Sequence, residues 1–148
     1  MTRQPERHLQ RAATPASETK SPRQRLLSYT LQSRRISMPS LGEYTFVGHS
    51  RTRYVFEVYP VDTNFKDGFA AVYIFSRGIN IHTQIPVYIG ETDKLGICIR
   101  NHEKWPCVRR NDAMFICIHG DSSRRSRKAR AQDLIKHYDP TCNLGQIL

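Results

Sequence analysis

Two tyrosines in strand-like segments are the side chains of this chain best suited to chemistry. Tyr73 ends an apolar tripeptide at 71–73, and Tyr88 lies in a Pro-Val-Tyr-Ile-Gly run at 86–90. Because side chains alternate between the two faces of a strand, both hydroxyls emerge on one side if the two strands pair. A tyrosine hydroxyl can relay or accept the proton of an attacking water. Gly90 would let a backbone approach a phosphate closely. Two strand tyrosines that only pack would have the same local pattern.

The residues after this run should form a helix that adds polar groups. Thr92 and Asp93 are good helix caps, and a helix that begins there must stop before Pro106. Such a helix carries Cys98 and His102 one turn apart on the same face. An imidazole and a thiol would then lie near the two tyrosines.

In their order and spacing these segments resemble the GIY-YIG nuclease family. The resemblance runs from residue 71 to residue 143, and it ends with a Leu-Ile pair at 134–135 and a Pro-Thr-Cys-Asn run at 140–143. A lone Tyr-Ile-Gly would be weak evidence, whereas the ordered set is more specific. The resemblance implies a Mg²⁺- or Mn²⁺-dependent endonuclease that hydrolyses phosphodiesters.

Two positions depart from the pattern of that family. Its members carry an arginine eight residues after the glycine of the second tripeptide, where this chain has Cys98, and a histidine is common four residues later. The metal-binding glutamate of the family falls three residues before the Leu-Ile pair, where this chain has Ala131. The positions that the resemblance marks as catalytic are Tyr73, Tyr88, Cys98, His102 and Asn143.

No neighbouring side chain fully replaces the two missing charges. Arg100 and Asp133 each lie two residues further on, about 200° around a helix, and so point away. Lys94 shares the face of Cys98 and could reach a phosphate, but it lacks the fork of a guanidinium. Loss of one preorganised charge costs about 10²–10³ in rate. We therefore expect weak or absent hydrolysis, with a catalytically dead nucleic-acid-binding module as the alternative.

Basic side chains predict contact with a polyanion. Lys and Arg number 23 against 13 acidic residues, which gives a formal charge of +10 and a pI near 9.8. This balance favours nucleic acid, with DNA before RNA, over an anionic membrane. The sequence contains no recognisable motif for contacts with base edges, so recognition of the nucleic-acid backbone or shape is expected. A solvated helix face is the alternative reading. The expected contacts are Lys94, Lys104, Arg109, Arg110, Arg124, Arg127 and Lys128.

The four cysteines, at positions 98, 107, 117 and 142, include no Cys-x-x-Cys pair. A chain of this length does not need disulfides, so free thiols in a reducing compartment are expected. Cys98, His102, Cys107 and His119 could form a zinc site, although their spacings match no common ligand pattern. A small basic Cys/His zinc-binding protein is thus a further alternative.

Residues 1–40 differ in composition from the rest. They contain eight Lys and Arg, two acidic residues and few apolar ones, so we expect a disordered basic tail before a domain at 41–148. The tail could be an electrostatic arm, an organellar transit peptide, or translation upstream of a start at Met38. We favour a tail without function and a cytoplasmic protein, with an organelle as the alternative if the tail is a transit peptide.

The sequence after the tail predicts a small α/β (α+β) domain. No apolar run approaches the roughly 20 residues that span a bilayer. Strand-like segments occur at 44–47, 53–59, 71–75, 86–89 and 113–119, and a second helix should start after Ser122 and run to about Tyr138. Its apolar residues at 131, 134, 135 and 138 form a core-facing stripe. We expect a mainly antiparallel sheet of three to four strands flanked by helices.

Overall fold

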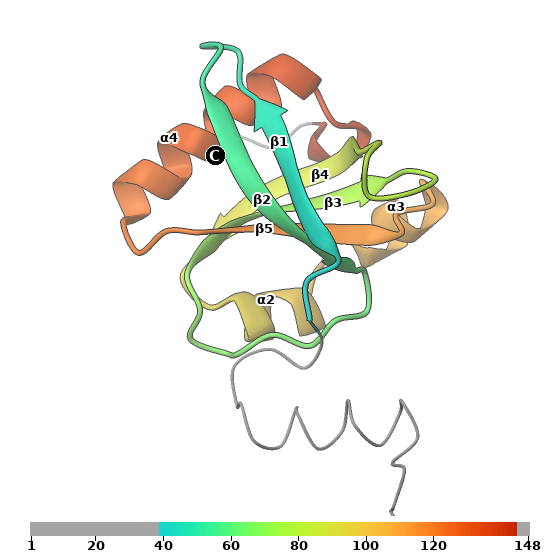
Figure 1. Ribbon diagram of the computed structural model, residues 1–148. Coiled ribbons are helices and arrows are strands. Elements are labelled where there is room, and N and C mark those ends of the chain that lie inside the picture. Colours follow the sequence, from blue (N-terminus) through green and yellow to red (C-terminus); the bar gives the residue numbers. More distant parts are fainter. Residues whose placement is uncertain (1–38, 145–148) are drawn as a thin grey trace, which may run out of the picture.

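Residues 39–144 form one β-sheet with helices on both faces in the computed structural model (Figure 1). Residues 1–38 and 145–148 lie outside the described residues, and so does the expected disordered tail except for its last two positions. The strands are β1 (Gly42–Val47), β2 (Arg53–Pro60), β3 (Ala71–Arg77), β4 (Ile85–Thr92) and β5 (Phe115–Gly120); the helices are α2 (Leu95–Arg100), α3 (Trp105–Arg110), α4 (Arg124–Tyr138) and the short 3-10 turn η1 (Thr141–Asn143).

The sheet has the strand order β1-β2-β5-β3-β4, and every neighbouring pair is antiparallel. The expected α+β class with an antiparallel sheet is confirmed. The sheet is larger than the three to four strands expected because the β1–β2 hairpin joins it along β5. Strand β3 lies between β5 and β4, and Tyr73 is opposite Ile118 of β5 and Gly90 of β4.

Side chains of β3 alternate between two apolar cores. Tyr73 and Phe75 point to the core that α2 and α3 cover. Val72 and Ile74 point to the opposite core, which includes Leu134 of α4. Figure 1 shows α4 on one side of the strands and α2 with α3 on the other. Burial of apolar area on both faces, at about 25 cal/mol per Å², holds the helices to the sheet.

The segment between β4 and β5 forms two short helices rather than the single helix expected up to Pro106. α2 ends at Arg100, and α3 begins at Trp105 with Pro106 in its first turn. Proline lacks a backbone N–H and clashes with the carbonyl four residues earlier, so one helix cannot continue through it. The same ring fits the first turn of a new helix. The break leaves His102 in the connection between the helices.

Helix α4 begins and ends where the sequence indicates. Its cap is Ser123, whose hydroxyl accepts the N–H of Ser126 at 3.2 Å. Its buried stripe includes Ala131 and Leu134, as expected, and it ends before Asp139 in a left-handed conformation with φ of 44°. No helix among the described residues is long and apolar enough to cross a membrane.

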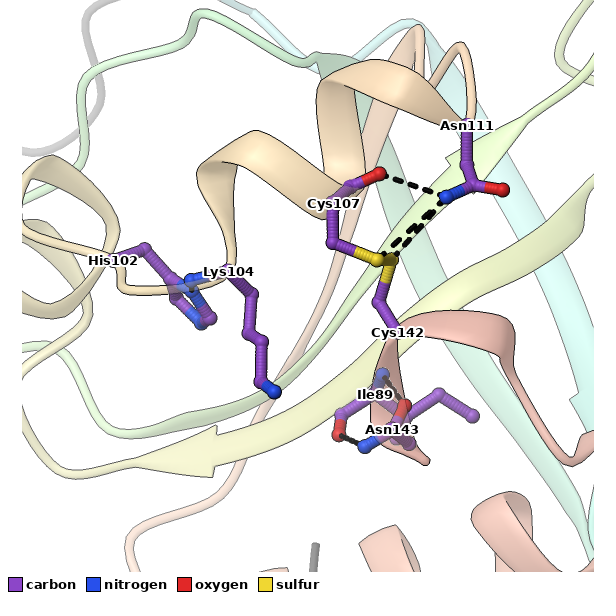
Figure 2. The surroundings of a disulfide bond; sticks show 7 residues. All are labelled: Ile89, His102, Lys104, Cys107, Asn111, Cys142 and Asn143. Carbon is purple, nitrogen blue, oxygen red and sulfur yellow. Dashed lines mark hydrogen bonds between the residues drawn. A yellow bond between two sulfur atoms is a disulfide. The ribbon is translucent and has the colours of Figure 1, made fainter. Parts of the chain in front are cut away.

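Cys107 of α3 and Cys142 of η1 form a disulfide across a sequence separation of 35 residues (Figure 2). The expectation of free thiols was therefore wrong for these two cysteines. Cys98 is half-buried and Cys117 is buried, and both are free. The sequence did not indicate the pair because only the fold brings α3 and η1 together, and a disulfide requires close Cα atoms.

Reduction of the Cys107–Cys142 bond should lower the free energy of unfolding by about 4 kcal/mol, because the bond closes a loop and restricts the unfolded chain. Urea unfolding followed by circular dichroism, with and without a thiol reductant, measures the loss. The double variant Cys107→Ser/Cys142→Ser is the control, since reductant should not change its unfolding. A loss below about 1 kcal/mol in the wild-type chain would contradict the expectation.

Candidate active-site cleft

The two tyrosines, the half-buried thiol and the histidine that the sequence singles out line one cleft. The cleft has a volume of about 400 Å³ and lies on the face of the sheet that α2 covers. The tyrosines reach it from adjacent strands, and the other residues come from α2 and the turn after it. Its lining is Tyr73, Tyr88, Ile97, Cys98, Asn101, His102 and Glu103.

Gly90 makes room for the hydroxyl of Tyr73. The two residues lie opposite each other on β4 and β3. A Cβ atom at Gly90 would meet the Tyr73 hydroxyl oxygen at 2.5 Å and a ring carbon of Tyr88 at 2.9 Å. Any larger residue would therefore displace a tyrosine. The space that we assigned to a phosphate from the sequence is taken by the side chain of Tyr73.

A hydrogen-bond chain connects His102 to both tyrosines. The backbone N–H of Lys104 donates to His102 Nδ1 at 3.1 Å, so this nitrogen is the acceptor of the neutral ring and Nε2 carries the proton. His102 Nε2 lies 2.7 Å from the Tyr73 hydroxyl and donates to it. The Tyr73 hydroxyl in turn hydrogen-bonds to Tyr88. The thiol of Cys98 also donates to Tyr73, at 3.6 Å.

Burial keeps this chain neutral. It raises the pKa of Tyr73 far above its usual value, and the neighbouring Tyr88 and Cys98 raise it further, so Tyr73 is a hydroxyl donor and not a phenolate base. Burial also lowers the pKa of His102 below its ordinary value of 6.5. The imidazole is therefore uncharged at neutral pH. The cleft can relay a proton, but its histidine does not supply a cation.

The cleft lining contains no lysine or arginine. Lys94, expected as a partial substitute for the missing arginine, is exposed and is not among the lining residues. Arg100 forms an ion pair with Asp67, so it points away as expected. The one carboxylate in the lining belongs to Glu103. The cleft thus lacks a group that would neutralise a phosphate in the way a positioned arginine does.

The cleft lining offers a divalent cation a single carboxylate. Mg²⁺ prefers oxygen ligands and uses one or two carboxylates. The carboxylate of Glu103 is exposed. Glu91, at the end of β4, forms an ion pair with Arg127. No group of three His, Cys, Asp or Glu residues that could hold a metal occurs among residues 39–144.

Ala131, the position of the family glutamate, is not in the cleft. It is fully buried on the opposite face of the sheet, in the core that α4 forms with β3 and β4. Asp133, two residues on, accepts hydrogen bonds from the Ser50 backbone and the Tyr54 hydroxyl, each at 2.8 Å. This carboxylate therefore anchors the β1–β2 turn to α4 and faces away from Ala131, as the helical spacing predicts.

Asn143 closes the outer edge of the sheet. Its side-chain oxygen accepts the backbone N–H of Ile89, and its side-chain nitrogen donates to the Ile89 carbonyl, both at 2.8 Å (Figure 2). This amide pairs with β4 as a neighbouring strand would, and it satisfies two buried backbone groups. Asn143 is absent from the cleft lining. We therefore assign it a positioning role at Ile89, the residue that follows Tyr88.

Arg127 is buried, so the expectation that it contacts phosphate was wrong. Its Nε atom donates to Glu91 Oε2 at 2.9 Å, and Nη1 donates to the carbonyl oxygens of Asp121 and Ser122 at 3.1 Å. Only 4% of its side chain is exposed. Arg127 lies one turn before Ala131 on the face of α4 that packs on the sheet. It ties the start of α4 to the end of β4.

The other basic residues belong to helical segments on both sides of the sheet. Four belong to the α2–α3 segment and two to α4, which covers the opposite face. Those of the α2–α3 segment are Lys94, Lys104, Arg109 and Arg110, and those of α4 are Arg124 and Lys128.

The candidate zinc ligands do not come together. Cys107 is consumed by the disulfide. The Nδ1 atom of His119 lies 2.7 Å from the Val55 carbonyl, and its ring packs on Phe56 in the sheet, away from Cys98. The zinc interpretation therefore has no site among the residues described.

Sequence reasoning missed the Glu91–Arg127 ion pair and the participation of Glu103 in the cleft. The position of Glu91 directly after Gly90, at the end of a strand, was the available signal for the first. The place of Glu103 in the cleft depends on the break between α2 and α3, and Pro106 was the only sign of that break in the sequence. Comparison with models of protein families, with curated proteins and with solved structures found no match.

The stability of the chain should depend on His102 in mildly acidic solution. Because the folded-state pKa of His102 lies below 6.5, its contribution is complete above that pH and is lost as the pH falls toward the lowered pKa. We expect the difference in unfolding free energy between wild type and His102→Gln to shrink over that window. Urea unfolding between neutral and mildly acidic pH measures it, with the exposed His82→Gln as control. A pH-independent difference would refute this assignment.

Proposed function

We propose that this chain is a GIY-YIG-type nucleic-acid-binding domain, with DNA before RNA as partner, in which phosphodiester hydrolysis is weak or absent. The observation that carries the proposal is the pair of tyrosines on adjacent strands, joined to His102 in a cleft that has no lysine or arginine in its lining. The fold supports the family resemblance through its sequence of elements. The charge of the chain supports the nucleic-acid partner.

The order of elements agrees with the resemblance. The two tyrosine-bearing strands are neighbours, and the short helices α2 and α3, the strand β5 and the long helix α4 follow before Asn143. The β1–β2 hairpin is an addition at the edge formed by β5. The same order would be expected of any protein that had kept the scaffold and lost the chemistry.

The first turn of α4 supports binding to phosphate. It contains Arg124 and Arg125, both exposed, and no acidic residue. The start of a helix carries a partial positive charge, which favours acidic residues there and is opposed by basic ones. A phosphate at this position would accept the free N–H groups and offset the charge repulsion. Lys128, one turn further on, extends the basic surface along the helix.

The chemistry of the cleft supports weak hydrolysis. Cleavage of a phosphodiester depends on a cation near the developing charge and on a metal held by carboxylate. By the resemblance, Cys98 occupies the position of the cationic arginine and Ala131 that of the metal-binding glutamate, and neither side chain is charged. The tyrosine–histidine chain remains, and it can hold or pass a proton. We infer that the scaffold retains proton relay without charge neutralisation.

Removal of the α4 charges should weaken DNA binding. The triple variant Arg124→Gln/Arg125→Gln/Lys128→Gln removes up to three phosphate contacts, each of which contributes about 0.9 to the slope of log affinity against log salt. We expect a lower affinity at every salt concentration and a shallower slope. Fluorescence anisotropy with a labelled duplex at several salt concentrations measures both quantities.

A triple variant with the same change in charge serves as the control. Arg53, Lys66 and Arg77 are exposed on β2, on the following loop and at the end of β3. Their replacement by glutamine should leave the salt dependence close to that of wild type. Equal losses in both triple variants would show that net charge alone drives binding. Salt-independent binding by wild type would refute the nucleic-acid proposal.

The wild-type chain should not nick supercoiled plasmid above the buffer rate in Mg²⁺ or Mn²⁺. Robust nicking that disappears in Tyr88→Phe would overturn the proposal of weak hydrolysis. In the variant Cys98→Arg/Ala131→Glu the new guanidinium would enter the cleft, whereas the new carboxylate would lie in the core on the opposite face of the sheet, so we expect no gain of Mg²⁺-dependent nicking. A gain of nicking in a folded double variant would contradict the placement of residue 131 outside the cleft.

The fold of the double variant must be checked first. Ala131 is fully buried, and an uncompensated charge in a core costs about 3–5 kcal/mol. Arg127, one turn away, could pair with the new carboxylate and reduce this cost, although it would then share its charge with Glu91. Urea unfolding of Ala131→Glu alone provides the reference.

A further inference from the structure

The disulfide lies at the junction of α3, η1 and β4, of which only β4 contributes a side chain to the cleft. It joins α3 to η1, and η1 packs against β4. Cys107 is half-buried, whereas Cys142 is 3% exposed. Because Cys107 is the more exposed of the two residues, its sulfur is the expected point of attack, and Cys142 is the expected leaving group. Displacement of a disulfide requires this kind of access to one sulfur.

An amide donor spans the two sulfurs. Asn111, the residue that ends α3, has its side-chain nitrogen 3.6 Å from Cys107 Sγ and 3.6 Å from Cys142 Sγ. The same nitrogen donates to the Cys107 carbonyl at 2.8 Å, which holds the amide in place (Figure 2). An N–H donor beside a departing sulfur stabilises the thiolate and so favours its release.

The turn that carries Cys142 also carries the residue that closes the sheet. Asn143 follows directly, and its amide makes both hydrogen bonds to Ile89 of β4. The residue before Ile89 is Tyr88 of the cleft. The disulfide thus holds η1 in place, and the hydrogen bonds of Asn143 hold the edge of β4 to η1.

We propose that Cys107–Cys142 is a thiol–disulfide exchange site for low-molecular-weight thiols, and that its reduction releases Asn143 from the edge of β4. The thiolate of the small thiol attacks Cys107 Sγ, the S–S bond breaks, and Cys142 leaves as a thiolate that takes up a proton. A second small thiol then displaces Cys107 from the mixed disulfide. The net reaction converts two small thiols and the protein disulfide into one small disulfide and two cysteines.

A redox titration of the full chain tests the proposal. The protein is equilibrated with reduced and oxidised glutathione at a series of ratios, and its free thiols are trapped and located by mass spectrometry. Trp105 is the single tryptophan and lies two residues before Cys107, so its fluorescence should follow the same transition. Hydrogen exchange of the peptide that contains Ile89 reports the edge of β4, and a β1–β2 peptide is the internal reference.

We expect one reversible transition that involves two thiols. Exchange at Ile89 should rise at least tenfold more on reduction than exchange in the β1–β2 peptide, which reports the general loss of stability. A bond that stays oxidised or stays reduced at every ratio would overturn the exchange site. Reduction without faster exchange at Ile89, or with equal acceleration in the reference peptide, would overturn the release of Asn143.

Three variants sharpen the result. Cys107→Ser/Cys142→Ser should lack the transition and show the Ile89 exchange of the reduced wild type, whereas Cys98→Ser should keep the transition. Asn111→Leu removes the donor and keeps the branched shape of the side chain, and we expect reduction by glutathione to slow about tenfold. Asn111→Gln, which restores an amide, should recover part of the rate. An Asn111→Leu rate equal to that of wild type would exclude the proposed role of the amide.

Discussion

The burial of β3 on both faces is the constraint on which the rest of the structure depends. Each residue from Ala71 to Ser76 is buried, so the strand needs a helical layer on either side and a neighbouring strand at each edge. Alternation then sends Tyr73 into the core beneath α2, where a phenol must find partners for its hydroxyl. His102, Tyr88 and Cys98 supply them. The cleft forms where this buried polar chain reaches the surface.

The position of charge in the molecule follows from the same arrangement. A polar chain that is largely buried is stable when it is neutral, and burial moves the pKa values of Tyr73 and His102 in the directions that keep it so. Cations are instead found on exposed helix surfaces and in ion pairs such as Arg127–Glu91. The proposed proton relay and the proposed phosphate contact thus belong to different surfaces. This separation is the physical basis for proposing binding without efficient hydrolysis.

Much of the fold could be predicted from the sequence because it depends on local patterns. The strands around Tyr73 and Tyr88 and the stripe of α4 follow from apolar periodicity. The break between α2 and α3 was missed because Pro106 was taken as the end of one helix and not as the start of another. The joining of β1–β2 to β5 depends on contacts between distant segments, which periodicity does not encode.

The candidate site was predictable only in part. The tyrosines and His102 were indicated by spacing, and they do lie in one cleft. Spacing did not indicate the burial of Arg127. A run of basic residues on a helix is usually exposed to solvent, and the sequence did not show that Arg127 pairs with Glu91. The same holds for Asn143, whose pairing with Ile89 requires the turn that Cys142 anchors.

The separation of phosphate attraction from proton relay is tested most directly by nuclear magnetic resonance. A ¹⁵N-labelled chain is titrated with a short DNA duplex at low salt, and shifts of the backbone amides are mapped. We expect large shifts in the first turn of α4, around Arg124 and Arg125, and small ones at Tyr73, Cys98 and His102. Shifts concentrated at the cleft, with α4 unaffected, would contradict this separation.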